Sequence, residues 1–141
     1  MPLSALARGF ARLASGGRDA QFGENFAALA DAMTAHPELV SGTGRNDADF
    51  MRCGRGDRVT KVGADGVQVV ASRSRSRGQA LALKVSDGGK LALYAATVAA
   101  LDQLGWVDQE QRDALRPWRR ETIVSVKGAP VGARRAALRL A

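Results

Sequence analysis

The chain has 141 residues, 45% of them hydrophobic and 25% charged, which is typical of one soluble globular domain. No apolar run approaches the roughly 20 residues that cross a bilayer, and the N-terminus lacks the pattern of a signal peptide. The single cysteine, Cys53, excludes an internal disulfide, so we expect a cytoplasmic protein with no membrane partner. The net charge of +7 is compatible with nucleic acid, but the arginines are spread from Arg8 to Arg139, which argues against such a ligand.

Two amphipathic helices are predicted at the start of the chain. Apolar residues recur at helical spacing over 3–13, and a second stripe predicts a helix from about 21 to 35. His36-Pro37 would end this helix, because the residue before proline avoids helical angles. The only histidine, His36, is predicted to act as a cation at that helix end rather than as a catalytic group or metal ligand.

A loop over 38–44 and a short helix that begins near Arg45 are predicted next. Asn46 or Asp47 would cap this helix. Cys53 lies just past its end and is predicted to be a small buried residue or an inert thiol, since nothing nearby would activate it.

Residues 58–70 contain the side chain with the clearest chemical potential, Lys61. Valine-rich runs on both sides predict two strands, with Gly63 and Gly66 at the turn between them. These glycines allow a ligand or a second backbone to come close. A lysine in such a place can act as a base where burial or a second cation favours its neutral form. The alternative is a hairpin whose lysine points into water.

The arginine-serine tract over 72–78 is similar to RNA-binding tracts only superficially. Its residues Arg73, Arg75 and Arg77 are predicted to form a solvated hairpin tip. The predicted elements after it are a strand over 79–85, a helix from 91 that ends at Gly105, a short helix with an Asp108/Gln111 capping box that stops at Pro117, a strand over 122–127 and a basic tail with helical propensity over 134–141.

This order of elements predicts an α+β fold with an antiparallel sheet and packed helices, in a single domain or part-domain over 1–141. The sequence contains no phosphate-binding loop, dinucleotide fingerprint, zinc spacing or Gly-x-Ser-x-Gly elbow. None of its serines has a lysine three residues later, so a Ser-x-x-Lys nucleophile is absent as well. No cofactor and no metal site is predicted.

Motifs that follow one another over most of the chain resemble the bacterial asparaginase II family, the rhizobial-type L-asparaginases. The motifs are residues 2–14, 32–33, 36–45, 61–67, 82–88 and 131–132. The resemblance implies a fold similar to serine β-lactamases and glutaminases, and hydrolysis of L-asparagine to aspartate and ammonia. It implies that Lys61 is the second catalytic lysine and that Gly63 and Asp65 contact the substrate. The family usually has glutamate where this chain has Asp65.

In that family the Ser-x-x-Lys motif, a further serine and the metal-binding cysteines precede the region that matches Pro2. The resemblance therefore implies the C-terminal portion of such an enzyme, inactive alone. A missing N-terminal half or a second copy of the chain would be its partner, and L-asparagine its substrate. The alternatives are a small basic nucleic-acid-binding protein or a non-catalytic partner protein.

Overall fold

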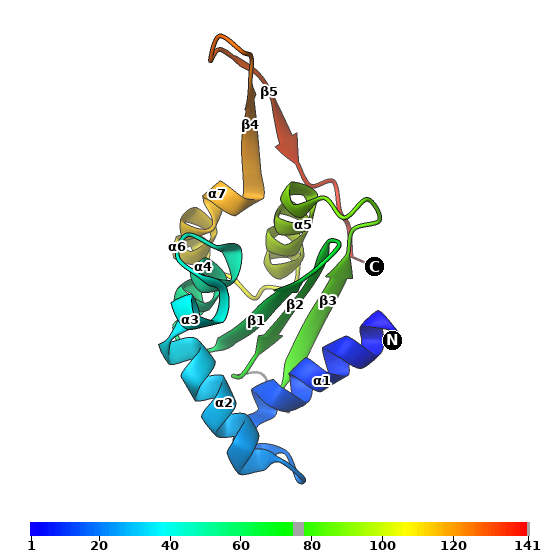
Figure 1. Cartoon of the computed structure of the whole chain (residues 1–141), viewed down its shortest axis with the longest axis vertical. Coiled ribbons are helices and arrows are strands. Elements are labelled where there is room, and N and C mark those ends of the chain that lie inside the picture. The colour runs from blue at the N-terminus through cyan, green and yellow to red at the C-terminus, as the bar shows by residue number, and fades with distance from the viewer. Residues whose placement is uncertain (75–77, 141) are drawn as a thin grey trace.

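The computed structural model describes residues 1–74 and 78–140, in which helices surround a small antiparallel sheet (Figure 1). The helices are α1 (Leu3–Ser15), α2 (Gly23–Ala35), α3 (Pro37–Ser41), α4 (Asn46–Cys53), α5 (Lys90–Gln103), α6 (Gln109–Ala114) and α7 (Arg116–Arg119), with a 3-10 turn η1 (Gly16–Arg18). The strands are β1 (Arg58–Gly63), β2 (Val67–Ser72), β3 (Gln79–Lys84), β4 (Arg120–Val124) and β5 (Pro130–Arg135). Within the described ranges, each helix is too short or too polar to cross a membrane.

The main sheet has the strand order β1-β2-β3, and both pairings are antiparallel. Lys61 lies opposite Val69, which lies opposite Ala82 on the third strand. Strands β4 and β5 form a separate antiparallel pair. The predicted α+β class with an antiparallel sheet is therefore confirmed.

Each face of the main sheet packs against helices, because successive side chains along a strand point to opposite faces. Figure 1 shows α1 and α5 lying against this sheet. The core with α1 and α2 contains Leu13, Ala14, Ala30, Val59 and Ala71. The core with α4 and α5 contains Phe50, Val70, Val98, Leu101, Trp106, Val107 and Leu115. The sheet is thus the shared support for both halves of the chain.

The first half of the chain departs from prediction at one helix. The predicted helix over 3–13 is confirmed as α1, and α2 begins two residues later than expected. The loop predicted over 38–44 is wrong in its first part, because α3 begins at Pro37. Proline suits the first position of a helix, where its missing N–H would have no partner. Pro37 therefore follows the end of one helix and starts the next.

Arg73 is not the solvated tip that the sequence predicts. Its guanidinium donates to Asp31 of α2 at 2.5 Å and to the Gly56 carbonyl at 3.2 Å, and 25% of the side chain is exposed. It therefore links the end of β2 to α2. Arg75 and Arg77 lie outside the described residues.

The C-terminal segment combines a confirmed cap with an unpredicted strand. The Asp108/Gln111 capping box is present at the start of α6. The predicted stop at Pro117 is wrong, since this residue lies within α7. The helical propensity of the tail over 134–141 does not produce a helix up to residue 140, because 130–135 form β5 and no helix follows within the described residues. The β4–β5 pair projects away from the helices (Figure 1), and every residue of β5 is exposed.

Candidate functional site

Asp47 lies at the centre of a buried polar cluster between α4 and the outer strand β1. Its side chain is 0% exposed. One carboxylate oxygen accepts the backbone N–H of Val62 at 2.7 Å. The other accepts Gln68 Nε2 at 2.7 Å and lies 3.1 Å from Thr60 Oγ1. Hydrogen bonds to a charged acceptor are stronger than neutral ones, so the cluster holds α4 against the sheet.

The structure shows that neither Asn46 nor Asp47 caps α4 as predicted, since α4 starts without a side-chain cap. Asn46 instead donates from Nδ2 to Gln68 Oε1 at 2.8 Å and is 1% exposed. The Asp47 carboxylate turns toward β1 because the Val62 N–H faces outward at the sheet edge and needs an acceptor. A partner from another element thus replaces the local cap.

Lys61 bends around the outer edge of β1 and meets the same cluster. Its Nζ donates to the Val62 carbonyl at 3.0 Å and lies 3.8 Å from Asp47 Oδ2. The side chain is 45% exposed. Asp47 and Lys61 therefore bind the outward-facing N–H and C=O of one residue, Val62. This fixes the amine beside a buried carboxylate while leaving it open to solvent.

Gly63 and Asp65 lie at the turn that follows Lys61, and both are exposed. A Cβ on Gly63 would lie 3.3 Å from the Val67 Cβ, so close packing across the hairpin also favours glycine there. Asp65 has a φ of 54°, and its side chain has no hydrogen bond or ion pair among the described residues. The structure places Lys61 and Gly63 on one strand edge and Asp65 two residues further along the turn.

This turn rests on the loop between β3 and α5. Gly66 has a φ of 73°, and its carbonyl accepts the Val85 N–H at 2.9 Å. A Cβ on Gly66 would lie only 2.9 Å from the Gly88 Cα. The backbone approach at Gly66 therefore positions the turn that carries Asp65.

Replacing Gly66 with alanine is expected to lower the free energy of unfolding by about 3 kcal/mol. Left-handed backbone strain contributes about 1–2 kcal/mol, and overpacking against Gly88 adds about 1–3 kcal/mol. Gly105→Ala is the matched control, because its φ is 64° but nothing lies within 4 Å of a Cβ there. Urea unfolding measures both variants. Equal losses would show that the contact with Gly88 does not constrain the turn.

Tyr94 lies near both Arg45 and the Asp47 carboxylate. Burial raises the pKa of Tyr94 above its usual value; the positive charge of Arg45 opposes this and the negative charge of Asp47 adds to it. The Tyr94 ring meets Trp118 edge-on at 5.2 Å between centroids. The sequence places Tyr94 only within the helix predicted from residue 91, so its place beside the cluster is unpredicted.

One sequence signal could have revealed the cluster. Thr60 and Gln68 are polar residues within valine-rich strands, and both are 0% exposed. A buried polar side chain requires a hydrogen-bonding partner. Two such residues on adjacent strands predict a nearby acceptor, which the structure identifies as Asp47.

The surroundings of Cys53 do not suit a metal ion. It is the only cysteine, and its Sγ lies 3.9 Å from Arg58 Nη1 and 3.6 Å from the Gln111 carbonyl oxygen. A guanidinium beside the sulfur disfavours a second cation. Burial raises the pKa of the Cys53 thiol, and the positive charge of Arg58 only partly opposes this. We therefore assign no metal chemistry to Cys53.

The raised pKa predicts slow alkylation of Cys53, because the thiolate is the reactive form. At pH 7.5, iodoacetamide is expected to modify Cys53 several-fold more slowly in the folded chain than in urea. Mass spectrometry of quenched samples measures the two rates. Equal rates would contradict a protected, protonated thiol.

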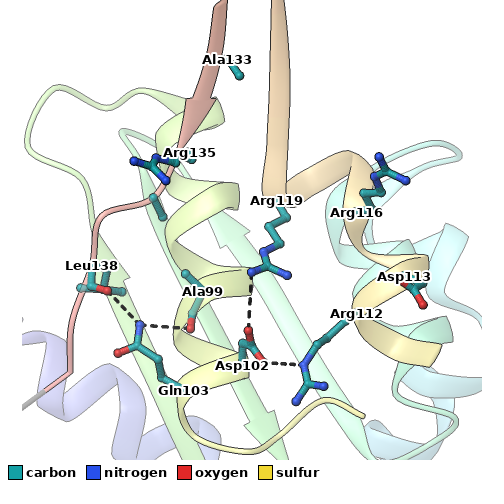
Figure 2. A pocket seen from close by; sticks show the side chains of 11 residues that line it. Ala99, Asp102, Gln103, Arg112, Asp113, Arg116, Arg119, Ala133, Arg135 and Leu138 are labelled. Carbon is teal, nitrogen blue, oxygen red and sulfur yellow. Dashed lines mark hydrogen bonds and ion pairs between the residues drawn. The ribbon is translucent and has the colours of Figure 1, made fainter. Parts of the chain in front are cut away.

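Lys61 lines neither the pocket shown in Figure 2 nor those beside Cys53, Arg18 and Ala80. The amine lies on the outer strand β1, and the Lys61 side chain is 45% exposed.

Sequence comparison assigns the chain to a family. The profile of the family described as L-asparaginase II matches residues 1–136. No curated protein matches the chain in a sequence search. The family match agrees with the order of motifs along the sequence and supports an L-asparaginase-type function in general. The chain belongs to the L-asparaginase II family.

Proposed function

We propose that the chain supplies the lysine part of an amidase site that hydrolyses L-asparagine to L-aspartate and ammonia through an acyl-serine intermediate. Family membership supports the substrate. The observation that carries the proposal is the Lys61 amine, held by the Val62 carbonyl and close to the buried Asp47 carboxylate. The amine is thus fixed by the protein and accessible to a ligand.

In this proposal the attacking serine comes from polypeptide outside these 141 residues, since no serine here belongs to a Ser-x-x-Lys motif. A serine β-lactamase-like arrangement would bring that segment to the edge of β1. The antiparallel sheet with helices against both faces supports this assignment. The partner is a separate N-terminal segment or a second copy of the chain. The lone cysteine is in keeping with a reducing cytoplasm.

The reaction proceeds in two steps. The serine oxygen bonds to the side-chain amide carbon of asparagine, the carbon–nitrogen bond breaks, and the nitrogen leaves as ammonia after receiving a proton. Water then attacks the acyl carbon, which releases aspartate and returns a proton to the serine. Lys61 carries protons between the serine and the leaving nitrogen, and a charged amine there stabilises the developing oxyanion. Asp47 is a positioning residue for that amine.

Gly63 and Asp65 form the substrate-facing part of the same edge in this proposal. Gly63 is exposed and brings no side chain next to Lys61. Asp65 presents an exposed carboxylate that can pair with the α-ammonium group of asparagine. Its turn is held in place by the contact between Gly66 and the β3–α5 loop.

An ammonia-release assay tests the proposal. The nucleotide sequence upstream of Met1 is read for an in-frame Ser-x-x-Lys segment, which is then co-expressed with the chain. Ammonia release from L-asparagine and L-glutamine is measured for the chain alone and for the pair. We expect release from asparagine by the pair only. An inactive pair, or a chain that is equally active alone, would overturn the proposal that the serine and Lys61 come from two separate polypeptide segments.

A further inference from the structure

A pocket of about 720 Å³ lies between the end of α5, the α6–α7 segment and β5 with the residues that follow it (Figure 2). Neither Lys61 nor the buried polar cluster around Asp47 lines this pocket. The charged side chains that line the pocket are Asp102, Arg112, Asp113, Arg116, Arg119 and Arg135. Four arginines against two aspartates leave an excess of two positive charges around a volume that suits a small molecule.

Asp102 organises two of these arginines at the end of α5. Its Oδ1 accepts Arg112 Nε at 2.5 Å, and its Oδ2 lies 3.8 Å from an Arg119 terminal nitrogen. Figure 2 shows the two arginine side chains converging on this carboxylate. A guanidinium has five N–H donors, so each arginine keeps donors for a ligand. The Arg112 and Arg119 side chains are 33% and 52% exposed.

Gln103 fixes the opposite wall of the pocket. Its Nε2 donates to the Leu138 carbonyl at 2.9 Å, and its Oε1 accepts the Leu140 N–H at 2.9 Å. The segment after β5 is therefore held across the end of α5. This places Arg135 of β5 at the same pocket as Arg119 (Figure 2).

Asp102 pairs with only two of the four arginines, Arg112 and Arg119. Asp113 accepts Gln109 Nε2 at 3.1 Å rather than an arginine. In the part of the chain that the structure describes, neither Arg116 nor Arg135 forms an ion pair. The Arg116 side chain points away from Asp102 in Figure 2 and therefore belongs to the rim. Ion pairs among the described residues therefore do not neutralise the excess positive charge of the pocket.

We infer that this pocket binds a small organic dianion whose charges lie on oxygen atoms, either a phosphate monoester or a dicarboxylate. Arg112, Arg119 and Arg135 bind the oxygens, because the guanidinium fork matches the spacing of paired oxygens in both groups. Ala99 and Leu138 contact the carbon part of the ligand. Binding at this pocket does not depend on asparagine hydrolysis at the Lys61 edge.

Isothermal titration calorimetry of the full chain tests this inference, with glycerol 3-phosphate and succinate as separate probes. The probe that binds identifies which oxyanion the pocket prefers. Arg119→Lys keeps the charge but removes the fork, and is expected to weaken binding by roughly tenfold. Arg135→Gln is expected to weaken it by a similar factor of roughly ten. Lys90→Gln removes a charge at the other end of α5 and should change the affinity less than twofold.

Three outcomes would overturn the inference. The first is no binding of either probe at millimolar concentration. The second is an equal loss of affinity in Lys90→Gln and Arg135→Gln, which indicates diffuse charge. The third is preferential binding of a short RNA that all three variants weaken alike. Circular dichroism confirms that each variant is folded.

Discussion

Replacing Lys61 with alanine is expected to lower kcat/KM for L-asparagine by roughly 100- to 10,000-fold in the proposed assembly of this chain with a serine-bearing segment. The reason is that Lys61 supplies the amine which the proposed reaction uses to move protons. Its contacts with the Val62 carbonyl and Asp47 hold this amine at the edge of β1. Initial rates of ammonia release at several substrate concentrations measure the loss.

Lys84→Ala provides a matched control for this loss. Lys84 is an exposed lysine at the end of β3, the opposite outer strand of the sheet, and its Nζ donates to the carbonyl of the next residue, Val85, as Lys61 does to Val62. It has no contact with Asp47 among the described interactions. The control should retain the turnover of the unmodified chain. Equal activities of Lys61→Ala and Lys84→Ala would remove Lys61 from the mechanism.

Asp47→Ala is expected to cause the largest loss of stability, about 3–5 kcal/mol in the free energy of unfolding. Removal of the carboxylate takes the acceptor from the part-buried Val62 N–H and one of the acceptors from the buried Gln68 Nε2, which keeps Thr60 Oγ1 at 2.7 Å. Each unsatisfied buried donor costs about 1–3 kcal/mol. Urea unfolding followed by circular dichroism measures the change.

Two further substitutions test whether the loss of stability is specific to the buried Asp47 carboxylate or follows from removing any aspartate. Asp31→Ala breaks the ion pair with Arg73, but the Asp31 side chain is 66% exposed, so the loss should stay below about 1 kcal/mol. Asp47→Asn keeps one acceptor oxygen and the side-chain volume, so its loss should fall between the two alanine variants. Similar losses for Asp31→Ala and Asp47→Ala would show that the cluster does not support the fold.

The elements that the sequence predicts correctly are those with local signals. The apolar spacing over 3–13 and the capping box at Asp108 depend on residues three or four positions apart. The two valine-rich strands are joined by a short turn with glycine and aspartate, which is also a local pattern. Local hydrogen bonds and side-chain spacing therefore suffice for these elements.

The roles of Asp47 and Arg73 were not predictable in the same way. Asp47 looks like a helix cap, but its partners Val62 and Gln68 lie 15 and 21 residues further along the chain. Arg73 looks like a solvated residue, yet its carboxylate partner is 42 residues away. Only the folded arrangement brings these groups together.

Strand β5 was missed for a related reason. The helical propensity of the tail over 134–141 overlaps β5 at its last two residues, Arg134 and Arg135. Pairing with β4 supplies hydrogen bonds that an exposed single strand would lack. Tertiary pairing therefore overrides the local preference for a helix.

The side chains of Lys61 and Asp47 bind the backbone C=O and N–H of Val62, and this limits where a further strand can join the sheet. At that position the β1 margin offers no free N–H or C=O to an incoming strand, whereas β3 forms the other margin of the described three-stranded sheet. A polypeptide that widens the sheet would add beside β3. Strand β1, which carries Lys61, would then remain the outer strand of the sheet, and its edge would face a cleft.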